Sequence, residues 1–518
     1  MKLFSIFILH IVFWAVCSTS AHGQVVESVL LNDARGGKTD LMYRMPSLRA
    51  SAPGLSVLPF HTGYYYNSDR SWGPNMGPVW LGKGYSQSLS GGLRLNTKYL
   101  DIQVRPVLLS SENRYFTQAK DFNRYTDPEI FIYDHIEGDI DAPLRIDDQA
   151  FSKLYGGDTW AKVKFWKLAG GVSSESLWWG PSKRGSLLLS NNAPGIWHAT
   201  IHTTSPINLY IMDVETQMLA GFLEPSESLQ DYRRDYRIIF NGLNISFAPA
   251  FDKNLKIGLI RTFILNENDI LTNRGYLPLF QPFLKNSLSL RSDGTTNDPD
   301  DQRASVYFSW AFPRANFHFY GELARDDHNA DLRDLYLHPN HMRAFTIGAQ
   351  KRWSNSQGLW SYTAEVTNLE STNTRVVRFG QTFYTHTRVE RGYTHYGQYL
   401  GSHYGQGGAG FFSSLFRTKG NWTSGLLFER VARNKEFYRR LKYHRKDSQP
   451  EIEFVFGAQT WYRGNRVDVG FEMNVVATQN RFALGLRPEG GTGRNNYHPR
   501  NLNLQLTIAY RPDWRILR

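Results

Sequence analysis

Apolar and polar residues alternate with a period of two along several segments, most clearly in residues 451–477. A period of two places alternate side chains on opposite faces of a β-strand. The short connection 463–465 separates two such runs, so the segment predicts a hairpin with one apolar and one polar face. The first run has Ile452, Phe454, Phe456 and Ala458 on one face and Glu453, Gln459 and Trp461 on the other, and the second run alternates Val467, Val469, Phe471, Met473 and Val475 with Asp468, Gly470, Glu472 and Asn474.

The same pattern recurs in residues 304–324, which predict a hairpin around a tight turn at 313–315. Segments 359–369 and 502–510 follow the same period. We expect Val306, Phe308, Trp310, Phe312, Phe317, Phe319 and Leu323 on the apolar face of the 304–324 hairpin, and His318, Tyr320 and Glu322 on the other. Water-soluble sandwiches alternate in this way too, so the period alone leaves sandwich and barrel open.

The spacing of the connections favours a barrel. Short turns such as 463–465 are interspersed with the long polar stretches 285–303, 325–343 and 433–450. Short turns at one rim and long loops at the other are typical of outer-membrane barrels. At roughly 25 to 28 residues for each strand and its loop, the chain predicts an all-β fold: a large antiparallel outer-membrane β-barrel of about 18 to 20 strands. Trp310, Trp353, Trp360, Trp461 and Tyr462 are candidates for its interfacial aromatic girdles, with ordinary packing as the alternative.

Composition excludes two other classes of protein. The mean hydropathy of −0.45 excludes a bundle of membrane helices. With 14% aromatic residues, the 518-residue chain is too rich in Phe, Tyr and Trp for long disorder. The net charge of +12 would suit nucleic acid, but in an exported barrel a basic lumen or loop more naturally attracts acidic glycan or the phosphates of lipopolysaccharide.

The N-terminus predicts export. A basic start, an apolar stretch over 3–16 and small residues up to Gly23 indicate a signal peptide cleaved after residue 23. A transmembrane anchor or a lipoprotein attached through Cys17 are the alternatives. We expect residues 1–23 to be the signal, 24–78 an N-terminal periplasmic or plug-like segment and 79–518 the barrel, with helical content limited to a short helix at 147–154.

Motifs for catalysis and for metals are weak. No nucleophile elbow, zinc helix, Walker loop or dinucleotide fingerprint stands in a fitting context, although a pair of carboxylates for glycoside hydrolysis stays possible. His338 and His341 lack a fixed third ligand, and the acidic run 293–301 lacks the spacing of a calcium loop. We therefore predict no enzyme activity, no cofactor and no metal site.

Two segments are candidates for contact with sugar. In Trp178-Trp179-Gly180-Pro181 the indole faces could stack on sugar rings, and the amides of Asn191 and Asn192 could bind hydroxyls. The alternative is a structural bulge whose tryptophans pack inside the barrel, followed by a turn at the two asparagines. Residues 392–399 leave the same choice between a glycan path and a closely packed strand or loop.

Several blocks of sequence resemble the capsule assembly Wzi family of Gram-negative outer-membrane proteins. The block 171–206, GVSSESLWWGPSKRGSLLLSNNAPGIWHATIHTTSP, is similar to the central block of that family. VWLGKGYSQSLSGGLRL and DIDAPLRIDDQAFSKLYGG precede it, and HPNHMRAFTIG and RGYTHYGQYLGS follow it, in the order of the family. The family's helical bundle on the periplasmic side has no clear counterpart here, because prolines and glycines interrupt residues 24–78.

The resemblance implies a lectin in the outer membrane of a Gram-negative bacterium that helps to attach or assemble capsular polysaccharide or exopolysaccharide at the cell surface. The predicted signal peptide is its expected export route. It implies contact with outer-membrane lipid and lipopolysaccharide, no nucleic-acid partner and a monomeric state. A channel for a small solute or a glycan fragment is the alternative function. The residues expected to bind polysaccharide are Trp178, Trp179, Arg184, Asn191, Asn192, Tyr393, His395, Gln398 and Tyr399.

Overall fold

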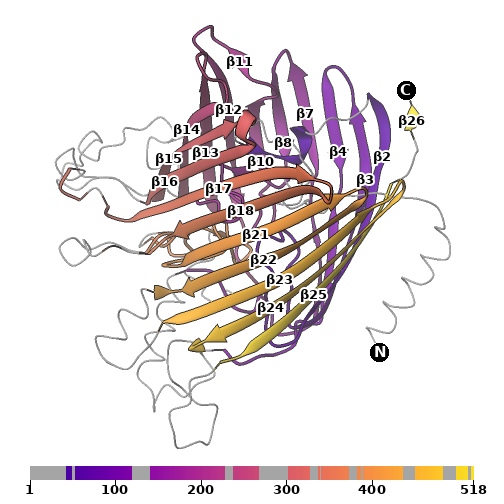
Figure 1. Ribbon diagram of the computed structural model, residues 1–518, viewed down its shortest axis with the longest axis vertical. Helices are drawn as coiled ribbons and strands as arrows, with labels where there is room; N and C mark the ends of the chain where they lie inside the picture. The colour runs from indigo at the N-terminus through magenta and orange to yellow at the C-terminus, as the bar shows by residue number, and fades with distance from the viewer. Residues whose placement is uncertain are drawn as a thin grey trace, which may run out of the picture.

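The structure is a computed structural model of the chain, and its main feature is one closed β-barrel (Figure 1). It describes residues 43–48, 53–118, 140–227, 237–267, 301–326, 336–338, 340–370, 372, 382–386, 389–435, 450–481, 498–511 and 515–517. The predicted signal peptide at 1–23 lies outside the described residues, as does most of each long polar stretch named above.

Antiparallel pairing runs without interruption around the barrel and returns from β25 to β2. The wall contains β2 (Gly54–Asn67), β3 (Gly84–Asn96), β4 (Leu100–Val104), β5 (Val107–Ser111), β6 (Phe151–Tyr155), β7 (Trp160–Phe165), β8 (Leu168–Ser173), β10 (His198–Thr203), β11 (Ile207–Asn208), β12 (Met212–Leu223), β13 (Ile238–Pro249), β14 (Leu255–Asn266), β15 (Asp301–Phe312), β16 (Phe317–Asp326), β17 (Arg343–Asn355), β18 (Gly358–Asn368), β21 (Ala409–Lys419), β22 (Trp422–Arg433), β23 (Glu451–Arg463), β24 (Val467–Gln479), β25 (Arg500–Tyr510) and β26 (Arg515–Leu517).

Two strands of the wall are broken in the middle. Both β4 and β5 pair with β3, so they form one strand interrupted at Pro106, which has no N–H to donate to the ladder. β6 and β7 pair with β5 and β4 in turn and are interrupted at Gly156-Gly157. Counted in this way, and with β11 and β26 as short additions, the barrel has 18 strands, as the sequence predicted.

The two predicted hairpins are confirmed in register and in face. β15 and β16 pair around a 3-10 turn at Pro313–Ala315, and β23 pairs with β24 around 464–466. Val306 is 53% exposed on the outer surface, whereas Tyr320 and Glu322 are buried on the inner one. Lipid can cover the apolar outer face, while the inner face carries the polar residues.

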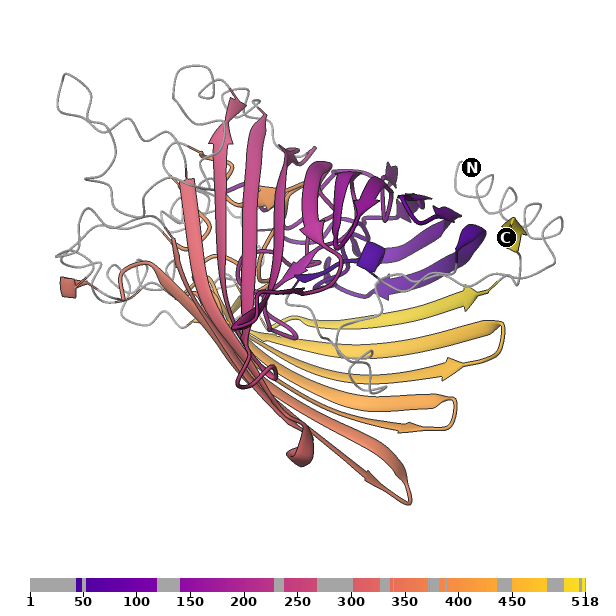
Figure 2. The same cartoon turned by 90° about the horizontal axis from the view of Figure 1, so that it is seen from above.

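The connections have the asymmetry that the sequence predicted. β15–β16, β17–β18, β21–β22 and β23–β24 are joined by turns of a few residues along one rim, which Figure 2 shows at the lower right. The connections at the opposite rim are long and include 68–83, 174–197 and 369–408. We call these ends the short-turn rim and the long-loop rim.

The three connections 68–83, 174–197 and 369–408 fold back into the barrel, and we call their described residues the plug. The largest buried cluster joins plug residues such as Trp179, Leu187 and Tyr384 to wall residues of β12–β17 and β22. Trp72 packs against β21–β24, and Val79 and Leu81 pack against β2, β5 and β6. The plug therefore contacts the wall on several sides.

Two expectations about the N-terminal part need correction. The predicted start of the barrel at residue 79 is wrong, because β2 lies before that residue and belongs to the barrel wall. Before β2, strand β1 (Tyr43–Arg44) lies inside the barrel and pairs with the plug. The helix expected at 147–154 is wrong too, because Phe151–Tyr155 is strand β6. Pairing of this segment with β5 outweighs any local helical preference.

Aromatic side chains gather near the short-turn rim. Trp353 and Trp360 stack with ring centroids 6.2 Å apart across β17 and β18, and Trp422 lies 4.9 Å from Tyr462. Trp461 is different, because it shares the inward face of β23 with Glu453. Within the described part of the chain, no helix has both the length and the apolar character to cross a membrane.

Candidate functional site

Trp178 and Trp179 form strand β9, which pairs with β1 inside the barrel. Both side chains are buried. The Trp179 indole N–H donates to Gln217 Oε1 of β12 (2.7 Å), and that of Trp178 donates to the Ser182 carbonyl (3.0 Å). Gly180 then takes a φ of +82°, which favours glycine and turns the chain into the next loop. The two tryptophans thus occupy packing positions in the plug.

The loop after these tryptophans wraps around one carboxylate of the wall. Glu365 of β18 accepts hydrogen bonds from the backbone N–H groups of Lys183 and Gly185 (2.7 Å each) and from the Ser182 hydroxyl (2.8 Å). The Tyr320 hydroxyl adds a further bond at 2.8 Å. Convergent donors of this kind stabilise a buried anion, so Glu365 fixes the loop 182–185 to the wall.

Arg184 forms the second fixed point of the same loop. Its Nε and Nη2 donate to the two carboxylate oxygens of Glu429 on β22, at 3.0 and 2.6 Å. Glu429 also accepts from Tyr404 Oη (2.8 Å). The pKa of Arg184 is raised because this pairing outweighs its burial. The structure thus gives Arg184 an internal partner in the plug.

The two asparagines join separate parts of the plug. Asn191 Nδ2 donates to the Asn75 carbonyl (3.1 Å), and Asn192 Nδ2 donates to the Tyr399 carbonyl (3.0 Å). Asn192 therefore lies next to Tyr399, although the two residues are far apart in the sequence. The sequence predicted both as glycan contacts, and here they share one neighbourhood.

Residues 394–399 form a small hairpin inside the barrel, made of β19 (Thr394–His395) and β20 (Gln398–Tyr399). Tyr396 and Gly397 both have positive φ, as a tight hairpin turn requires. His395 is buried, and its Nδ1 accepts the Glu224 N–H at 2.9 Å. Burial lowers the pKa of His395 to about 3, and Arg391 adds to the effect, so this imidazole is neutral.

Tyr393, just before the hairpin, is fully buried. Its ring stacks on that of Tyr384, with centroids 5.7 Å apart. The guanidinium of Arg303, a residue of β15, lies 4.4 Å from the centroid of the Tyr393 ring. Trp178, Trp179, Arg184, Tyr393 and His395 are thus held within the interior. Their predicted contact with polysaccharide stays a prediction.

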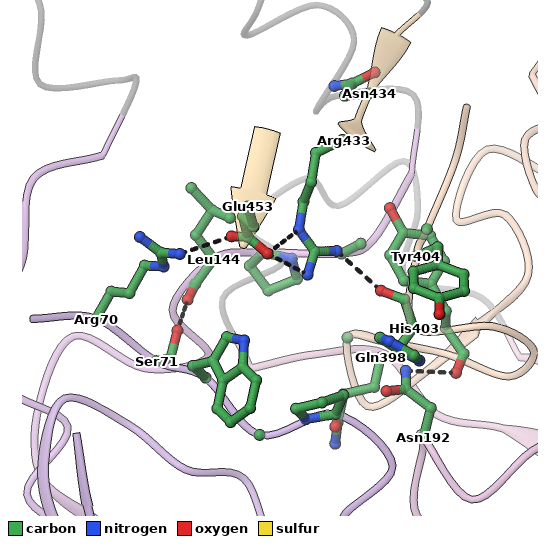
Figure 3. Close-up of a pocket in the computed structure, with 18 of the residues that line it drawn as sticks. Arg70, Ser71, Leu144, Asn192, Gln398, His403, Tyr404, Arg433, Asn434 and Glu453 are labelled. Atoms are coloured by element: carbon green, nitrogen blue, oxygen red, sulfur yellow. Dashed lines mark hydrogen bonds and ion pairs between the residues drawn. The ribbon is translucent and has the colours of Figure 1, made fainter. Parts of the chain in front are cut away.

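Gln398, Tyr399 and Asn192 line a cavity of about 230 Å³, which we call the mouth cavity (Figure 3). Strand ends at the long-loop rim supply part of it: Arg433 closes β22 and Glu451 and Glu453 open β23. Plug loops supply the rest. Its polar and aromatic lining is Arg70, Ser71, Trp72, Trp80, Phe116, Asn192, Gln398, Tyr399, His403, Tyr404, Gln406, Arg433, Asn434, Glu451, Glu453 and Arg481.

Ion pairs organise the charged side of the mouth cavity. Glu453 lies between two guanidinium groups, with Arg70 Nη2 at 2.7 Å and Arg433 Nη2 at 2.8 Å (Figure 3). Arg481 Nη1 lies 2.7 Å from Glu451 Oε1. Both carboxylates are thus held by arginines, which suits them to position charge and leaves neither placed as a free acid for proton transfer.

His403 connects this cavity to the anchored loop. Its Nε2 lies 3.1 Å from Glu429 Oε1, so that Nε2 carries the proton and donates. Burial lowers the pKa of His403 despite the nearby carboxylate, so the ring is neutral and its Nδ1 is an acceptor. This nitrogen has no partner in the part of the chain that the structure describes.

Sequence reasoning missed the charged residues of the mouth cavity and its aromatic residues other than Tyr399. Arg70 and Glu453 are 383 positions apart, so no local motif could join them. The one available signal was that Arg433 begins a long polar stretch. Metal ligation gains no support, since no cluster of three or more His, Cys, Asp or Glu occurs among the described residues.

A second cavity of about 250 Å³ lies toward the short-turn rim and is lined by Ser47, Arg94, Asp101, Lys162 and Lys164 among others. Arg94 pairs with Asp101 at 2.8 Å, and Lys162 pairs with the buried Glu175. Ser47 also donates its backbone N–H to Glu175 (2.8 Å). These pairs tie the N-terminal segment to the plug.

Comparison with solved structures supports the barrel fold. The chain is similar to an outer-membrane protein of Escherichia coli described as Wzi, a carbohydrate-binding β-barrel involved in group 1 capsule assembly, with a TM-score of 0.57, 14% identity, and 88% of this chain and 85% of that chain covered. Pseudomonas aeruginosa OpdK (TM-score 0.40, 9% identity, 88% and 98% covered) and Acinetobacter baumannii OccAB3 (0.41, 8%, 88% and 99%) are more distant.

A comparison with the curated proteins finds no match. The model of the capsule assembly protein Wzi family matches residues 82–449, which include the plug loop with Trp178 and Trp179 and most of the barrel wall. This match covers well over half of the chain and agrees with the resemblance of the sequence blocks. The chain therefore belongs to the capsule assembly Wzi family.

Proposed function

We propose that this protein binds capsular polysaccharide or exopolysaccharide at the outer surface of a Gram-negative outer membrane and helps to attach or assemble it there. The observation that carries the proposal is the mouth cavity at the long-loop rim, with aromatic, amide and charged side chains around one space. Aromatic faces stack on sugar rings, and amides, guanidinium groups and carboxylates bind hydroxyls.

The size of the mouth cavity bears on the mode of binding. Its volume of about 230 Å³ is below the roughly 300–1,000 Å³ of pockets for drug-sized ligands. It suits a terminal residue or a branch of a glycan. The membership in the Wzi family and the carbohydrate-binding E. coli barrel of the same fold agree with this role.

The packing of the plug argues that a channel for a small solute or a glycan fragment is not the main function. Plug residues pack into buried clusters with wall strands on several sides, and a solute path would have to pass through these contacts. We further propose export with cleavage after residue 23, a monomeric barrel whose apolar outer face contacts lipid and lipopolysaccharide, and no catalytic step.

Deletion of the gene in the producing strain tests the role in attachment. We expect unchanged total polysaccharide with a smaller cell-bound share and a larger released share, both restored by the complementing gene. Loss of glycan from cells and medium together would place the protein in synthesis or export. Purified full-length protein in planar bilayers gives the second measurement, and a large steady conductance would favour the channel.

A further inference from the structure

Arginines outnumber glutamates among the described side chains that line the mouth cavity. These side chains are Arg70, Arg433, Arg481, Glu451 and Glu453. All but Arg433 are less than a tenth exposed. A buried guanidinium group is unfavourable unless its N–H groups find acceptors in place of water. Burial lowers the pKa of Arg70, and repulsion from Arg481 and Arg433 adds to this, against the attraction of Glu453 and Glu451.

Several polar atoms around the same space have no partner in the described part of the protein. They are Arg70 Nη1, Gln398 Nε2 and His403 Nδ1, on side chains that are 4%, 8% and 6% exposed. The indole N–H of Trp80 is a fourth. A buried polar group without a partner costs about 1–3 kcal/mol, and such groups in a folded protein call for an explanation. Because all four residues line the mouth cavity, a bound polar molecule would explain them together.

We propose that the mouth cavity binds a sugar residue bearing a carboxylate, with the buried Arg70 guanidinium, whose Nη1 has no partner in the described part of the protein, as the element that selects an acidic glycan over a neutral one. This inference rests on the proposed function. The guanidinium groups attract the carboxylate, the Gln398 amide and the Trp80 indole donate to hydroxyl or ring oxygens, and the neutral His403 accepts from a hydroxyl.

The chemistry selects a carboxylate sugar over the simpler anions. Donors and an acceptor occur together in the cavity, and aromatic rings stand beside them. A free inorganic anion would use the donors and leave both the acceptor and the rings without a role. An acidic sugar offers an anion, hydroxyl groups and an apolar ring face in one residue.

The experiment uses the polysaccharide purified from the producing strain in three forms: native, carboxyl-reduced and dephosphorylated. Binding of each form to the full-length protein in detergent is measured at low and at physiological salt. We expect the native and the dephosphorylated forms to bind alike, and the carboxyl-reduced form to bind at least tenfold more weakly. Affinity for the native form should fall with salt, because attraction between charges is screened.

Two variants place the effect in the mouth cavity. Arg70→Gln should weaken binding of the native glycan about tenfold or more and leave binding of the carboxyl-reduced glycan unchanged. Arg417→Gln, the same charge change near the short-turn rim, where Arg417 donates to the Gln357 carbonyl, is the matched control and should change neither. Trp80→Phe keeps an aromatic ring and removes the indole N–H, which has no partner among the described residues, together with part of the ring that packs against the Val79 and Leu81 cluster. It should bind both forms less tightly, and heat-modifiable migration on gels checks that it folds.

The outcomes separate this inference from the proposed function. Equal binding of native and carboxyl-reduced glycan would overturn the carboxylate and leave polysaccharide binding intact. Loss of binding only after dephosphorylation would overturn it in favour of a phosphate. Binding of no form at all would refute the proposed function itself. If Arg70→Gln does not fold, the comparison of the glycan forms on the unaltered protein still decides the question.

Discussion

Removal of the Glu365 carboxylate should loosen the plug while leaving the barrel folded. Glu365 accepts from two backbone N–H groups of the loop 182–185 and from the Ser182 and Tyr320 hydroxyls at 2.7–2.8 Å, and from the Arg184 N–H at 3.2 Å. In Glu365→Ala these donors lose a buried acceptor. Since the wall keeps its backbone ladder with β17 and β21, the change falls on the plug.

The expected magnitude follows from the number and kind of these bonds. Hydrogen bonds to a charged group contribute roughly 1.5–3 kcal/mol each, but burial of the carboxylate opposes them. Removing one partner of a buried charged network costs about 3–5 kcal/mol. That cost raises the open fraction of the loop by about two to three and a half powers of ten. Glu365→Gln keeps one acceptor and should lie between Glu365→Ala and the unaltered protein.

A single cysteine in the plug measures this opening. The chain has one cysteine, Cys17, in the predicted signal peptide, so Ala193→Cys at a buried plug position gives a unique thiol in the cleaved protein. The rate of maleimide labelling then follows the open fraction. Glu215→Gln is the matched control, because Glu215 is a buried carboxylate of β12 that accepts from Lys256 of β14 and Ser246 of β13, both in the wall. Heat-modifiable migration on gels confirms that each barrel is folded. Labelling of folded Glu365→Ala at the rate of the unaltered protein would refute the role of Glu365 as an anchor.

Two further predictions concern the plug. Trp179→Ala empties a fully buried site and should cost about 3–5 kcal/mol, seen as a lower folded fraction on gels. Trp179→Phe should cost less, because the phenyl ring fills part of the site although the bond to Gln217 is lost. Burial lowers the pKa of His395 to about 3 in the closed plug. Below pH about 6.5 the imidazole of an opened plug therefore binds a proton that the closed plug does not bind. The closed plug is fully stable above that pH and loses about 1.4 kcal/mol of stability for each pH unit on acidification. The thiolate that reacts with maleimide becomes rarer as pH falls, so each rate is divided by that of the same cysteine in the denatured protein at the same pH. This ratio for Ala193→Cys should rise as pH falls, and less so in His395→Asn, whose amide oxygen can still accept the Glu224 N–H.

The barrel wall could be predicted because each strand and each short turn is specified by residues that are close together in the sequence. In the hairpin of β23 and β24, each strand shows the period of two, and the short connection fixes the register. The face of Trp461 followed from the same alternation, since it shares the parity of Glu453. A one-residue slip would expose the polar face to lipid, so the pattern constrains the pairing strongly.

The plug could not be predicted because its information is nonlocal. The run 186–193 contains three consecutive leucines and has no strand or helix in the structure. Its groups find partners far away in the sequence: the Ser190 hydroxyl donates to the Gly401 carbonyl at 2.6 Å. Likewise, no local sequence pattern predicts that Glu365 binds the loop that begins at Ser182. The structure places Trp178 and Trp179 in buried packing positions inside the barrel, which the sequence analysis gave as the alternative to contact with sugar.

The mouth cavity depends on the plug. Asn192 and Tyr399 belong to plug segments, whereas Arg433 and Glu453 belong to the wall, so the cavity exists only while the plug is in place. A substitution that frees the plug should therefore weaken glycan binding and accelerate thiol labelling together. A substitution of a cavity residue of the wall, such as Arg433→Gln, should weaken binding and leave labelling unchanged. This difference separates a residue that contacts the glycan from one that builds the surface the glycan meets.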